Sequence, residues 1–294
     1  MASRSETVSI VIVTYNSQPA LQTCLGALSV SVRGIPVELI VVDNDSDTDP
    51  TDSVRERFAD ARVIRLARNV GFAAACNRGA AVSAGEMLLF LNPDVFIDDR
   101  AVETLRDRCV SDSRAGLLSG RLRFPDGSFQ ATCRNFPTAA NLLYSRGSIL
   151  SRWLTRLSGT KPDPYTLPDS ETVTEVPAVA GTMMMVRRSL FEKAGGFDER
   201  FFLYMEDTDL SLRVNRAGYR NLFVPTAGAV HDWGKGGRMS RVRRLWRHHY
   251  SVWQYFLKHE PNAFALFLLP LLLFANGVLM SILPRTHLRS SSPQ

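Results

Sequence analysis

The sequence predicts an α/β fold with a doubly wound, mostly parallel sheet, because strand-like runs alternate with helical patterns in its N-terminal third. Segments 8–14 and 37–43 are short, rich in β-branched residues and end in polar residues, as buried parallel strands do. Between them, Leu21, Leu25 and Leu28 recur at helical spacing within 19–30. Parallel strands joined by helices require crossovers on the faces of the sheet, which gives the doubly wound arrangement.

The same patterns continue along the chain. They predict strands at 62–66 and 87–92 with an alanine-rich helix at 72–84 between them, regular structure at 176–187, a helix near 204–216 and a strand at 219–224. Asp126 and Gly127 stand between aromatic residues in 124–129 and indicate a hairpin turn. The segment 135–175 is irregular and contains four prolines, so we expect a long connection or a lid there.

Composition excludes a disordered or collagen-like chain. The 294 residues include 45% apolar residues, and 35 Lys and Arg against 29 Asp and Glu give a net charge of +6. This length allows one large domain with an appendage, or two small domains. Seven of the basic residues lie between Lys235 and Lys258 without an acid, so the rest of the chain carries a net charge of −1. The basicity is therefore local.

The two ends of the chain and its cysteines bear on the compartment. The four cysteines form no Cys-x-x-Cys pair, which fits neither a zinc site nor a dense disulfide framework and predicts reduced core thiols of a cytosolic protein. The apolar run 8–13 is too short for a signal peptide or a membrane span. Segment 263–283 has no charge and is long enough to span a bilayer or to lie in one leaflet.

Polar residues follow the predicted strands at their carboxyl ends, where doubly wound sheets bind ligands. They are Thr14, Tyr15 and Asn16 after the first strand, Asp43 and Asn44 after the second, and Asn92 and Asp94 after the fourth. Neither a Gly-x-Gly-x-x-Gly segment nor a Gly-x4-Gly-Lys-Ser/Thr segment is present, which argues against dinucleotide-binding and P-loop sites. We therefore expect a nucleotide that is held by strand-end carboxylates and a metal.

An ordered set of motifs resembles family 2 glycosyltransferases of the GT-A fold, and most of all the bacterial members that transfer rhamnose or galactofuranose to cell-envelope glycans. The motifs are VTYN (13–16), VVDN (41–44), RNVGFAAACNRG (68–79), LNPDV (91–95), GGFDERFFLYMEDTDLSLR (195–213) and VHDWG (230–234). The resemblance runs from about residue 8 to residue 234. We accordingly expect a catalytic domain at 7–234 and a membrane-associated tail at 235–294.

The resemblance implies a divalent metal, Mg²⁺ or Mn²⁺, that neutralises the leaving diphosphate. The family's Asp-x-Asp motif corresponds to Asn92-Pro93-Asp94 here, so one carboxylate is replaced by an amide. The implied metal ligands are Asp94 and His231. The alternatives are that 92–94 is only a turn and that His231 is a structural histidine. The asparagine variant also occurs in rhamnosyltransferase-like members, which favours rhamnose as the sugar.

For the donor, the resemblance implies that Asp43 accepts a hydrogen bond from a pyrimidine N3–H. The other residues that it assigns to donor binding are Thr14, Tyr15, Asn16, Asn44, Asn69, Gly71, Asn77 and Asn92. Several of these residues are equally typical of caps and turns.

The predicted helix at 204–216 contains the candidate base. Asp207 shares a helix face with Leu210 and Val214 and lies in the first turn, where the helix dipole favours an ionised carboxylate. The family's Glu-Asp motif implies that Asp207 deprotonates the acceptor hydroxyl, which gives inversion at the anomeric carbon. Asp209 and Arg213 lie four residues apart and are interpreted as a surface ion pair.

The last segments of the chain are basic and then apolar. The glycine-rich run 234–238 is either a mobile lid or a linker. Segment 241–258 predicts an amphipathic helix with basic residues on one side, which suits an anionic membrane surface. Nucleic-acid binding, or packing of its apolar face on the catalytic domain with a solvated charged face, would use the same pattern. Pro270 slightly favours a re-entrant hairpin within the apolar stretch.

The sequence thus predicts an inverting, metal-dependent glycosyltransferase on the cytoplasmic side of the cell membrane, peripheral or monotopic, and no nucleic acid as partner. Our preferred donor is dTDP-rhamnose, and the acceptor is a polyprenyl-diphosphate-linked or growing envelope glycan. The alternatives are a galactofuranosyl or other hexosyl transferase that uses a UDP-sugar, a nucleic-acid-binding protein, and a catalytically inactive scaffold of the same fold.

Overall fold

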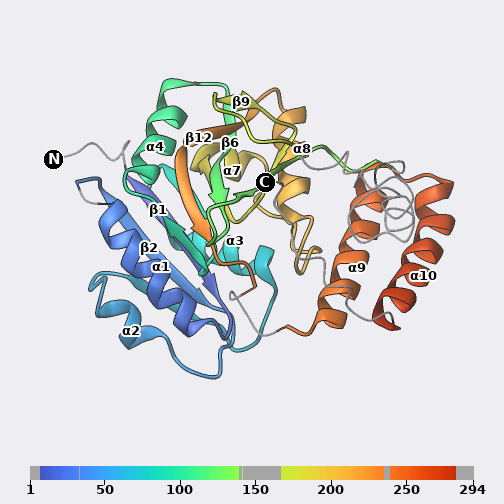
Figure 1. The fold of residues 1–294 in the computed structure, drawn as a ribbon, viewed down its shortest axis with the longest axis horizontal. Helices are drawn as coiled ribbons and strands as arrows, with labels where there is room; N and C mark the ends of the chain where they lie inside the picture. Colours follow the sequence, from blue (N-terminus) through green and yellow to red (C-terminus); the bar gives the residue numbers. More distant parts are fainter. Residues whose placement is uncertain (1–6, 33, 139–140, 142–166, 235–238, 283–294) are drawn as a thin grey trace.

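A ten-stranded mixed sheet forms the centre of the protein, with helices on both faces and a helical pair at one side (Figure 1). The computed structural model describes residues 7–32, 34–138, 141, 167–234 and 239–282. The strands are β1 (Val8–Thr14), β2 (Val37–Asp43), β3 (Arg62–Arg65), β4 (Met87–Leu91), β5 (Val95–Ile97), β6 (Ala115–Arg123), β7 (Phe129–Gln130), β8 (Cys133–Arg134), β9 (Thr174–Glu175), β10 (Ala178–Val179), β11 (Met183–Arg187) and β12 (Arg220–His231). The helices are α1 (Gln18–Ser31), α2 (Thr51–Arg55), α3 (Phe72–Val82), α4 (Ala101–Ser111), α7 (Arg188–Lys193), α8 (Glu206–Arg216), α9 (Arg241–His259), the π-helix η2 (Phe264–Leu268) and α10 (Leu269–Ile282).

The sheet order is β3-β2-β1-β4-β11-β6-β12-β5, and β8 and β10 form a separate two-stranded sheet. The pairs β2–β3, β1–β2, β1–β4 and β6–β12 are parallel, which confirms the predicted doubly wound half. β11 is antiparallel to both of its neighbours. The carboxyl ends of β1, β2 and β4 therefore lie along one edge of the sheet, as the sequence predicts.

Two predicted boundaries differ from the structure. The last strand was expected to end at Val224 but continues to His231, because its register shifts between Val224 and Gly228 and pairing then resumes with β6. The predicted connection 135–175 lies mostly outside the described residues, but Thr174–Glu175 pairs with β12 as β9. The predicted hairpin is confirmed, because β6 and β7 pair across the turn that contains Gly127, whose φ is +83°.

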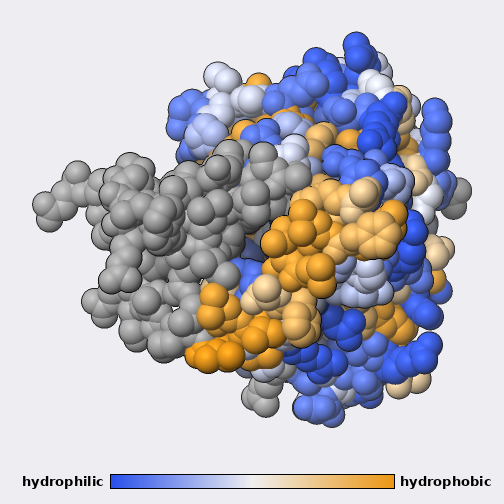
Figure 2. Space-filling view, turned by 90° about the vertical axis from the view of Figure 1, so that its right-hand side faces the viewer, coloured by the Kyte–Doolittle hydropathy of each residue, from blue (hydrophilic) through white to orange (hydrophobic). Residues whose placement is uncertain are grey.

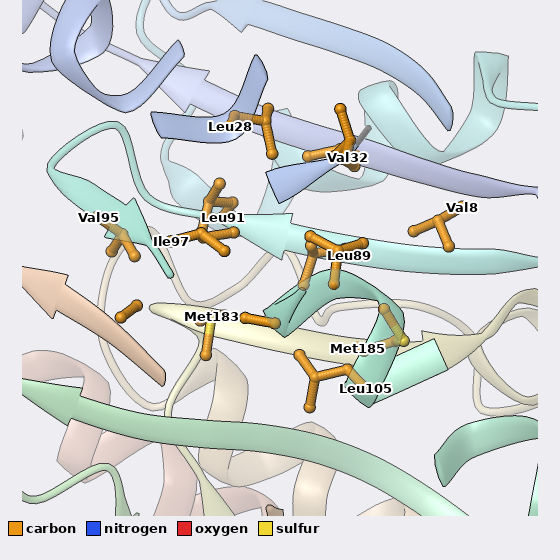
Figure 3. Close-up of a cluster of buried hydrophobic side chains, with 14 of the residues drawn as sticks. Val8, Leu28, Val32, Leu89, Leu91, Val95, Ile97, Leu105, Met183 and Met185 are labelled. Carbon is orange, nitrogen blue, oxygen red and sulfur yellow. The ribbon is translucent and has the colours of Figure 1, made fainter. Parts of the chain in front are cut away.

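One face of the sheet packs against α1, α2 and α4. Leu89 and Leu91 of β4 meet Met183 and Met185 of β11, and Leu28 of α1 covers them (Figure 3). All of these side chains are buried. Burial of such side chains on a pleated surface is the main stabilising contribution to this half of the protein.

The opposite face packs against α3, α7 and α8. The alanine-rich α3 lies so close to β1 that a Cβ atom at Gly79 would be 2.4 Å from Val11 Cγ1. Phe90 of β4 packs against Phe191 and Phe197 at ring-centroid distances of 5.1 and 4.9 Å. This close packing places the first turns of α3 and α8 at the same edge of the sheet as the strand ends.

The C-terminal helices form a third apolar cluster beside the sheet. Val252, Tyr255 and Phe256 of α9 pack on Phe201 and Met205, which precede α8. α10 runs back along α9, since the ring of Trp246 packs against Phe274 and Gly277 while Trp253 Nε1 donates to the carbonyl of Ala265. The apolar face of α9 is therefore covered by protein.

The helix at Phe264–Ile282 is long and apolar enough to cross a membrane, by length and composition. It runs without interruption through Pro270, so the structure does not show the re-entrant hairpin that this proline slightly favours. Pro270 is the second residue of α10 and follows the wider turn of η2, where a missing N–H is tolerated. Large apolar side chains of this helix are exposed and contribute to an apolar band on one face of the molecule (Figure 2). They include Phe267, Leu271, Phe274 and Ile282.

The four cysteines are buried free thiols, as predicted. Burial raises the pKa of the Cys24 and Cys133 thiols, which keeps them protonated and unreactive. Residues 235–238 of the predicted glycine-rich lid or linker lie outside the described residues.

Candidate active site

A cavity of about 1360 Å³ opens at the carboxyl ends of the strands. It extends from the loops after β1, β2 and β4 to the first turns of α3 and α8 and to the start of α9. Of the residues predicted for the site, those that line it are Tyr15, Asn44, Asn69, Gly71, Asn92, Asp94, Asp207 and His231. The fold thus brings residues that are far apart in the sequence to one cavity.

Asn44 organises the wall of the cavity between β2 and α3. Its side chain donates to Asn69 Oδ1 at 3.1 Å and to the carbonyl of Gly71 at 3.2 Å, and it accepts from the N–H of Val70 at 2.9 Å. Gly71 has a φ of +91°, and a Cβ atom there would be 2.5 Å from the carbonyl oxygen of Phe202. Only glycine fits this turn without displacing the loop that precedes α8.

Thr14, Asn16 and Asp43 do not line the cavity but tie together the loops beside it. The buried Asp43 accepts from Arg65 Nε at 2.9 Å and from the N–H of Ser46 at 3.2 Å. Asn16 accepts from the N–H of Asp47 at 2.8 Å, and the hydroxyls of Thr14 and Ser17 are 2.7 Å apart. These contacts hold the ends of β1 and β2 in a fixed arrangement.

Asn77 lies on α3 away from the cavity. Its amide donates to the carbonyl of Phe197 at 2.8 Å, and its oxygen accepts from the N–H of the same residue at 2.9 Å. The side chain therefore fastens α3 to the turn after α7.

Asp94 and His231 form a buried pair across the cavity from α8. His231 ends β12, and its Nε2 is 3.3 Å from Asp94 Oδ1. Its Nδ1 is 2.8 Å from Gln130 Oε1, which can only accept, so Nδ1 carries a hydrogen. The Nε2 atom of His231 therefore faces a carboxylate oxygen of Asp94.

The pair is chemically suited to a divalent cation. Carboxylate oxygens bind both Mn²⁺ and Mg²⁺, whereas an imidazole nitrogen suits a transition-metal ion such as Mn²⁺ better than Mg²⁺. Gln130 orients the imidazole from behind, as residues around metal ligands do. In the part of the chain that the structure describes, no group of three or more His, Cys, Asp or Glu gathers as a metal site.

Asp207 is the second residue of α8, and three neighbouring residues hold its side chain. Its Oδ2 pairs with the guanidinium of Arg134 and accepts from the N–H of Gly181 at 2.9 Å. Its Oδ1 accepts from the N–H of Thr208 at 2.6 Å. The carboxyl group is thus fixed in orientation and in contact with the cavity, which are two requirements for a base.

The turn before α8 has unusual backbone geometry. Tyr204 and Met205 both have a φ of +70°, a conformation that costs about 1–3 kcal/mol for residues other than glycine. The α9 helix holds this turn, because Ser251 Oγ donates to the carbonyl of Leu203 at 2.8 Å and Met205 is buried against α9. The tail of the chain therefore helps to orient Asp207.

Glu206 lines the same cavity and is almost completely buried. Among the described residues, its Oε2 has no hydrogen-bond partner. Burial, followed by the neighbouring charge of Asp207, raises the pKa of Glu206 to about 8. At neutral pH the residue is therefore mostly uncharged and does not place a second negative charge beside Asp207.

The prediction that Asp209 and Arg213 form a surface ion pair is wrong. Asp209 is completely buried and contacts Arg213, Lys258 and His259 at 2.6–2.8 Å. The last turn of α9 covers Asp209. Helical spacing cannot predict this contact, because the two segments are far apart in the sequence. Burial acts in the opposite direction, but these donors lower the pKa of Asp209 below its usual value.

The predicted charged side of α9 is also arranged differently. Arg244 lines the cavity, and the guanidinium of Arg247 lies 4.1 Å from the ring centroid of Phe202. Both therefore contact the part of the protein that precedes α9, whereas Arg243 is exposed. The expectation that the basic residues lie largely on the side opposite the apolar face of this helix, free to meet a membrane, does not hold for Arg244 and Arg247, because both pack toward the rest of the protein.

Sequence reasoning missed three residues that complete the site: Gln130, Arg134 and Arg244. Gln130 directly follows the predicted hairpin, so the turn pattern in the sequence could have indicated that it lies near the cavity. Arg134 reaches Asp207 from a strand pair that the sequence did not predict. Arg244 was recognised only as part of a basic helix.

Comparisons with known proteins agree with this geometry. Glycosyl transferase family 2 matches residues 9–195, and Glycosyl transferase family group 2 matches residues 152–293. An N-acetylglucosaminyl-diphospho-decaprenol L-rhamnosyltransferase of Mycobacterium tuberculosis is 30% identical over 265 residues, which is 85% of this chain and 83% of that protein. Rhamnosyltransferase WbbL of Escherichia coli K12 is 31% identical over 50% of this chain and 52% of its own length.

Solved structures show the same fold. GalNAc-T7 with UDP, GalNAc and Mn²⁺ matches 85% of this chain with a TM-score of 0.58 and 18% identity, and the chain spans about half (48%) of that protein. A mannosyltransferase from Pyrobaculum calidifontis with GDP-Man and Mn²⁺ matches 93% of this chain and 73% of its own, with a TM-score of 0.56 and 19% identity. The chain is a glycosyltransferase with the GT-A fold and belongs to glycosyl transferase family 2.

Proposed function

We propose that the protein transfers L-rhamnose from dTDP-rhamnose to a hydroxyl of a lipid-diphosphate-linked glycan, with inversion at the anomeric carbon. One observation carries the proposal: a single cavity contains both the Asp94–His231 pair and the oriented carboxylate of Asp207. The mycobacterial relative, whose name describes an L-rhamnosyl transfer to a decaprenol-linked diphosphate, supports the choice of sugar and acceptor.

The roles in the reaction follow from the chemistry of these groups. Asp207 accepts the proton of the acceptor hydroxyl while the oxygen of that hydroxyl forms a bond to the anomeric carbon. The bond from that carbon to the diphosphate breaks on the opposite side, and its electron pair leaves with the diphosphate. Asp94 and His231 would hold Mn²⁺ or Mg²⁺, which supplies charge neutralisation of the leaving group when bound.

Donor binding is assigned to the edge formed by β1, β2 and the start of α3. Tyr15, Asn44, Asn69 and Asn92 line this part of the cavity and offer side chains to the nucleoside and the diphosphate. We propose that Asp43 accepts a hydrogen bond from the pyrimidine N3–H of the donor. Thr14, Asn16 and Asn77 are assigned to holding the loops and the helix beside the donor in place.

We assign residues 7–234 to the catalytic domain and 235–294 to a tail that places it at the cytoplasmic face of the membrane. The exposed apolar side chains of α10 support contact with lipid (Figure 2). The four buried, reduced cysteines are compatible with the cytoplasm.

A panel of nucleotide sugars tests the proposal. Purified full-length protein is incubated with dTDP-rhamnose, UDP-galactofuranose, UDP-glucose or GDP-mannose, each with Mn²⁺, Mg²⁺ or EDTA. We expect thermal stabilisation and slow hydrolysis with dTDP-rhamnose and metal, and neither with EDTA. A preference for UDP-galactofuranose would replace the proposed sugar. Equal hydrolysis in EDTA would refute the proposal that the reaction depends on a divalent metal.

A further inference from the structure

The cavity has a second charged end that the reaction described above does not use. The start of α9 forms this end, with Met239 and Arg244 among the residues that line it. Arg247, one turn further along α9, lies on the ring of Phe202, which also lines the cavity. Two guanidinium groups therefore stand where the cavity meets the helical tail.

Within residues 7–32, 34–138, 141, 167–234 and 239–282, neither of these two arginines makes an ion pair, whereas Arg213 and Lys258 both pair with the buried Asp209. Arg247 is held in place by its contact with an aromatic ring, which leaves its N–H groups free to donate. An uncompensated, positioned pair of guanidinium groups at a cavity is suited to bind an anion with several oxygens.

The surroundings indicate which anion this is. The donor edge, with Asn44, Asn69 and the Asp94–His231 pair, belongs to the strand ends, whereas Arg244 belongs to the tail helix. Beyond α9 lies the exposed apolar side of α10, with Phe267, Leu271 and Phe274 (Figure 2). A ligand that reaches from Asp207 past Arg244 to α10 meets a base, then positive charge, then an apolar surface. A sugar joined through a diphosphate to a lipid presents matching groups in that order.

We propose that Arg244 and Arg247 bind the diphosphate of the lipid-linked acceptor, and that the start of its lipid lies along α10. This inference rests on the proposed function, since it assumes a lipid-diphosphate acceptor. It gives α9 two tasks: one side holds the turn before Asp207, and its first two turns bind the acceptor. The acceptor hydroxyl is thereby brought to a base whose position the same helix fixes.

The test compares three acceptors with the full-length enzyme and a saturating donor. N-acetylglucosamine is linked to a short prenyl diphosphate, to the corresponding monophosphate, or to a neutral alkyl chain of the same length. We expect the wild type to use the diphosphate with the lowest KM. Arg244→Gln should raise that KM about 10- to 100-fold, as expected for loss of a charged hydrogen bond, and should remove most of the preference for the diphosphate. Arg247→Gln should act in the same direction, and the exposed Arg243→Gln is the matched control.

Two further readouts separate other sources of the same chemistry. The donor Kd should stay within about twofold of wild type in Arg244→Gln; a large loss of donor affinity would assign the arginine to the donor diphosphate instead. Binding to vesicles of phosphatidylglycerol and phosphatidylcholine should fall no more in Arg244→Gln than in Arg243→Gln. A larger loss of vesicle binding in Arg244→Gln would show that Arg244 binds the membrane surface instead.

Failure of the inference is distinguishable from failure of the proposed function. If the wild type transfers to the diphosphate acceptor and Arg244→Gln keeps the same preference among the three acceptors, the inference is wrong and the function stands. If the wild type transfers to none of the three acceptors while it hydrolyses the donor, the proposed acceptor is wrong, and the inference falls with it.

Discussion

The helix α8 presents two aspartates to two different regions of the molecule. Asp207 faces the cavity and is bound by Arg134, the N–H of Gly181 and the N–H of Thr208, with 8% of its surface exposed. Asp209 faces the tail helix α9, is completely buried, and is bound by one arginine, one lysine and one histidine. Both residues lie in the first turn of one helix, and both pair with an arginine.

The difference lies in what surrounds each carboxylate. Asp209 is enclosed by cations from the same chain, so no part of it is available to a ligand and its role is to fasten α9 to the catalytic domain. Asp207 has a mixed set of donors and an open cavity beside it. A buried charge is therefore structural or functional according to its access to the cavity, and burial alone does not distinguish the two.

Replacing the cavity-side aspartate should have the largest effect. Asp207→Asn keeps the size of the side chain but removes the base, so we expect kcat to fall about 10³-fold. The donor Kd should change little, because the donor edge is built from β1, β2 and α3. Rapid-quench measurements of a single turnover separate the chemical step from product release. Retention of more than a tenth of the wild-type rate would show that another group takes the proton.

Replacing the tail-side aspartate should instead affect stability. Asp209→Asn leaves Lys258, His259 and Arg213 without their shared carboxylate in a buried site, which should cost about 3 kcal/mol or more in the free energy of unfolding. Urea titration followed by circular dichroism measures this. The exposed Asp107→Asn is a suitable control, since its ion pair with Arg106 is on the surface and should change stability by less than about 1 kcal/mol. Equal effects of the two substitutions would contradict the structural role of Asp209.

The cavity side can be tested further at Gln130, which touches the imidazole of His231 and does not face the tail. Gln130→Ala removes the acceptor that fixes the histidine ring, so we expect the Mn²⁺ concentration for half-maximal activity to rise about 10- to 100-fold. The unfolding free energy should change far less than in Asp209→Asn. A Mn²⁺ titration curve that superimposes on that of the wild type would contradict the assignment of His231 as a metal ligand oriented by Gln130.

The smallest expected effect is a pH dependence of the tail contact. Burial acts the other way, but donors from Arg200 and Lys258 hold the pKa of Asp198 well below its usual value, and the pKa of Asp209 is lowered too. Since the folded pKa values lie below the unfolded value of about 3.9, their stabilisation is complete above that pH and is lost as the pH falls through the folded values. Thermal unfolding between pH 7 and pH 3 should show a smaller decline in Asp209→Asn than in the wild type. Parallel declines in the two proteins would contradict this assignment.

The two sides of α8 also show what sequence could and could not predict. Alternating strands and helices predicted the doubly wound half, and strand-end polar residues together with the family resemblance predicted Asp94, His231 and Asp207 as parts of one site. The structure places all three at the same cavity. Their common location could be predicted because the parallel strand ends and the first turn of a helix follow from local patterns, whereas their roles stay predictions.

The tertiary partners were out of reach of such patterns. Helical spacing paired Asp209 with Arg213 correctly but placed the pair on the surface, because nothing local indicates that Lys258 and His259 return to cover it. The same reason accounts for Arg134, whose strand pairs with a segment more than forty residues away. Amphipathicity predicted α9, yet it could not show that Arg244 lines the cavity or that Arg247 packs on the ring of Phe202.

The account as a whole is tested most directly by the stereochemistry of the transfer. Full-length protein with Mn²⁺, dTDP-rhamnose and N-acetylglucosamine linked to a short prenyl diphosphate yields a product whose anomeric configuration is read by NMR. We predict a rhamnosyl product with the configuration opposite to that of the donor, formed by the wild type and not by Asp207→Asn. A product that retains the donor configuration, or one formed equally fast by Asp207→Asn, would contradict the assignment of Asp207 as the base of a single displacement.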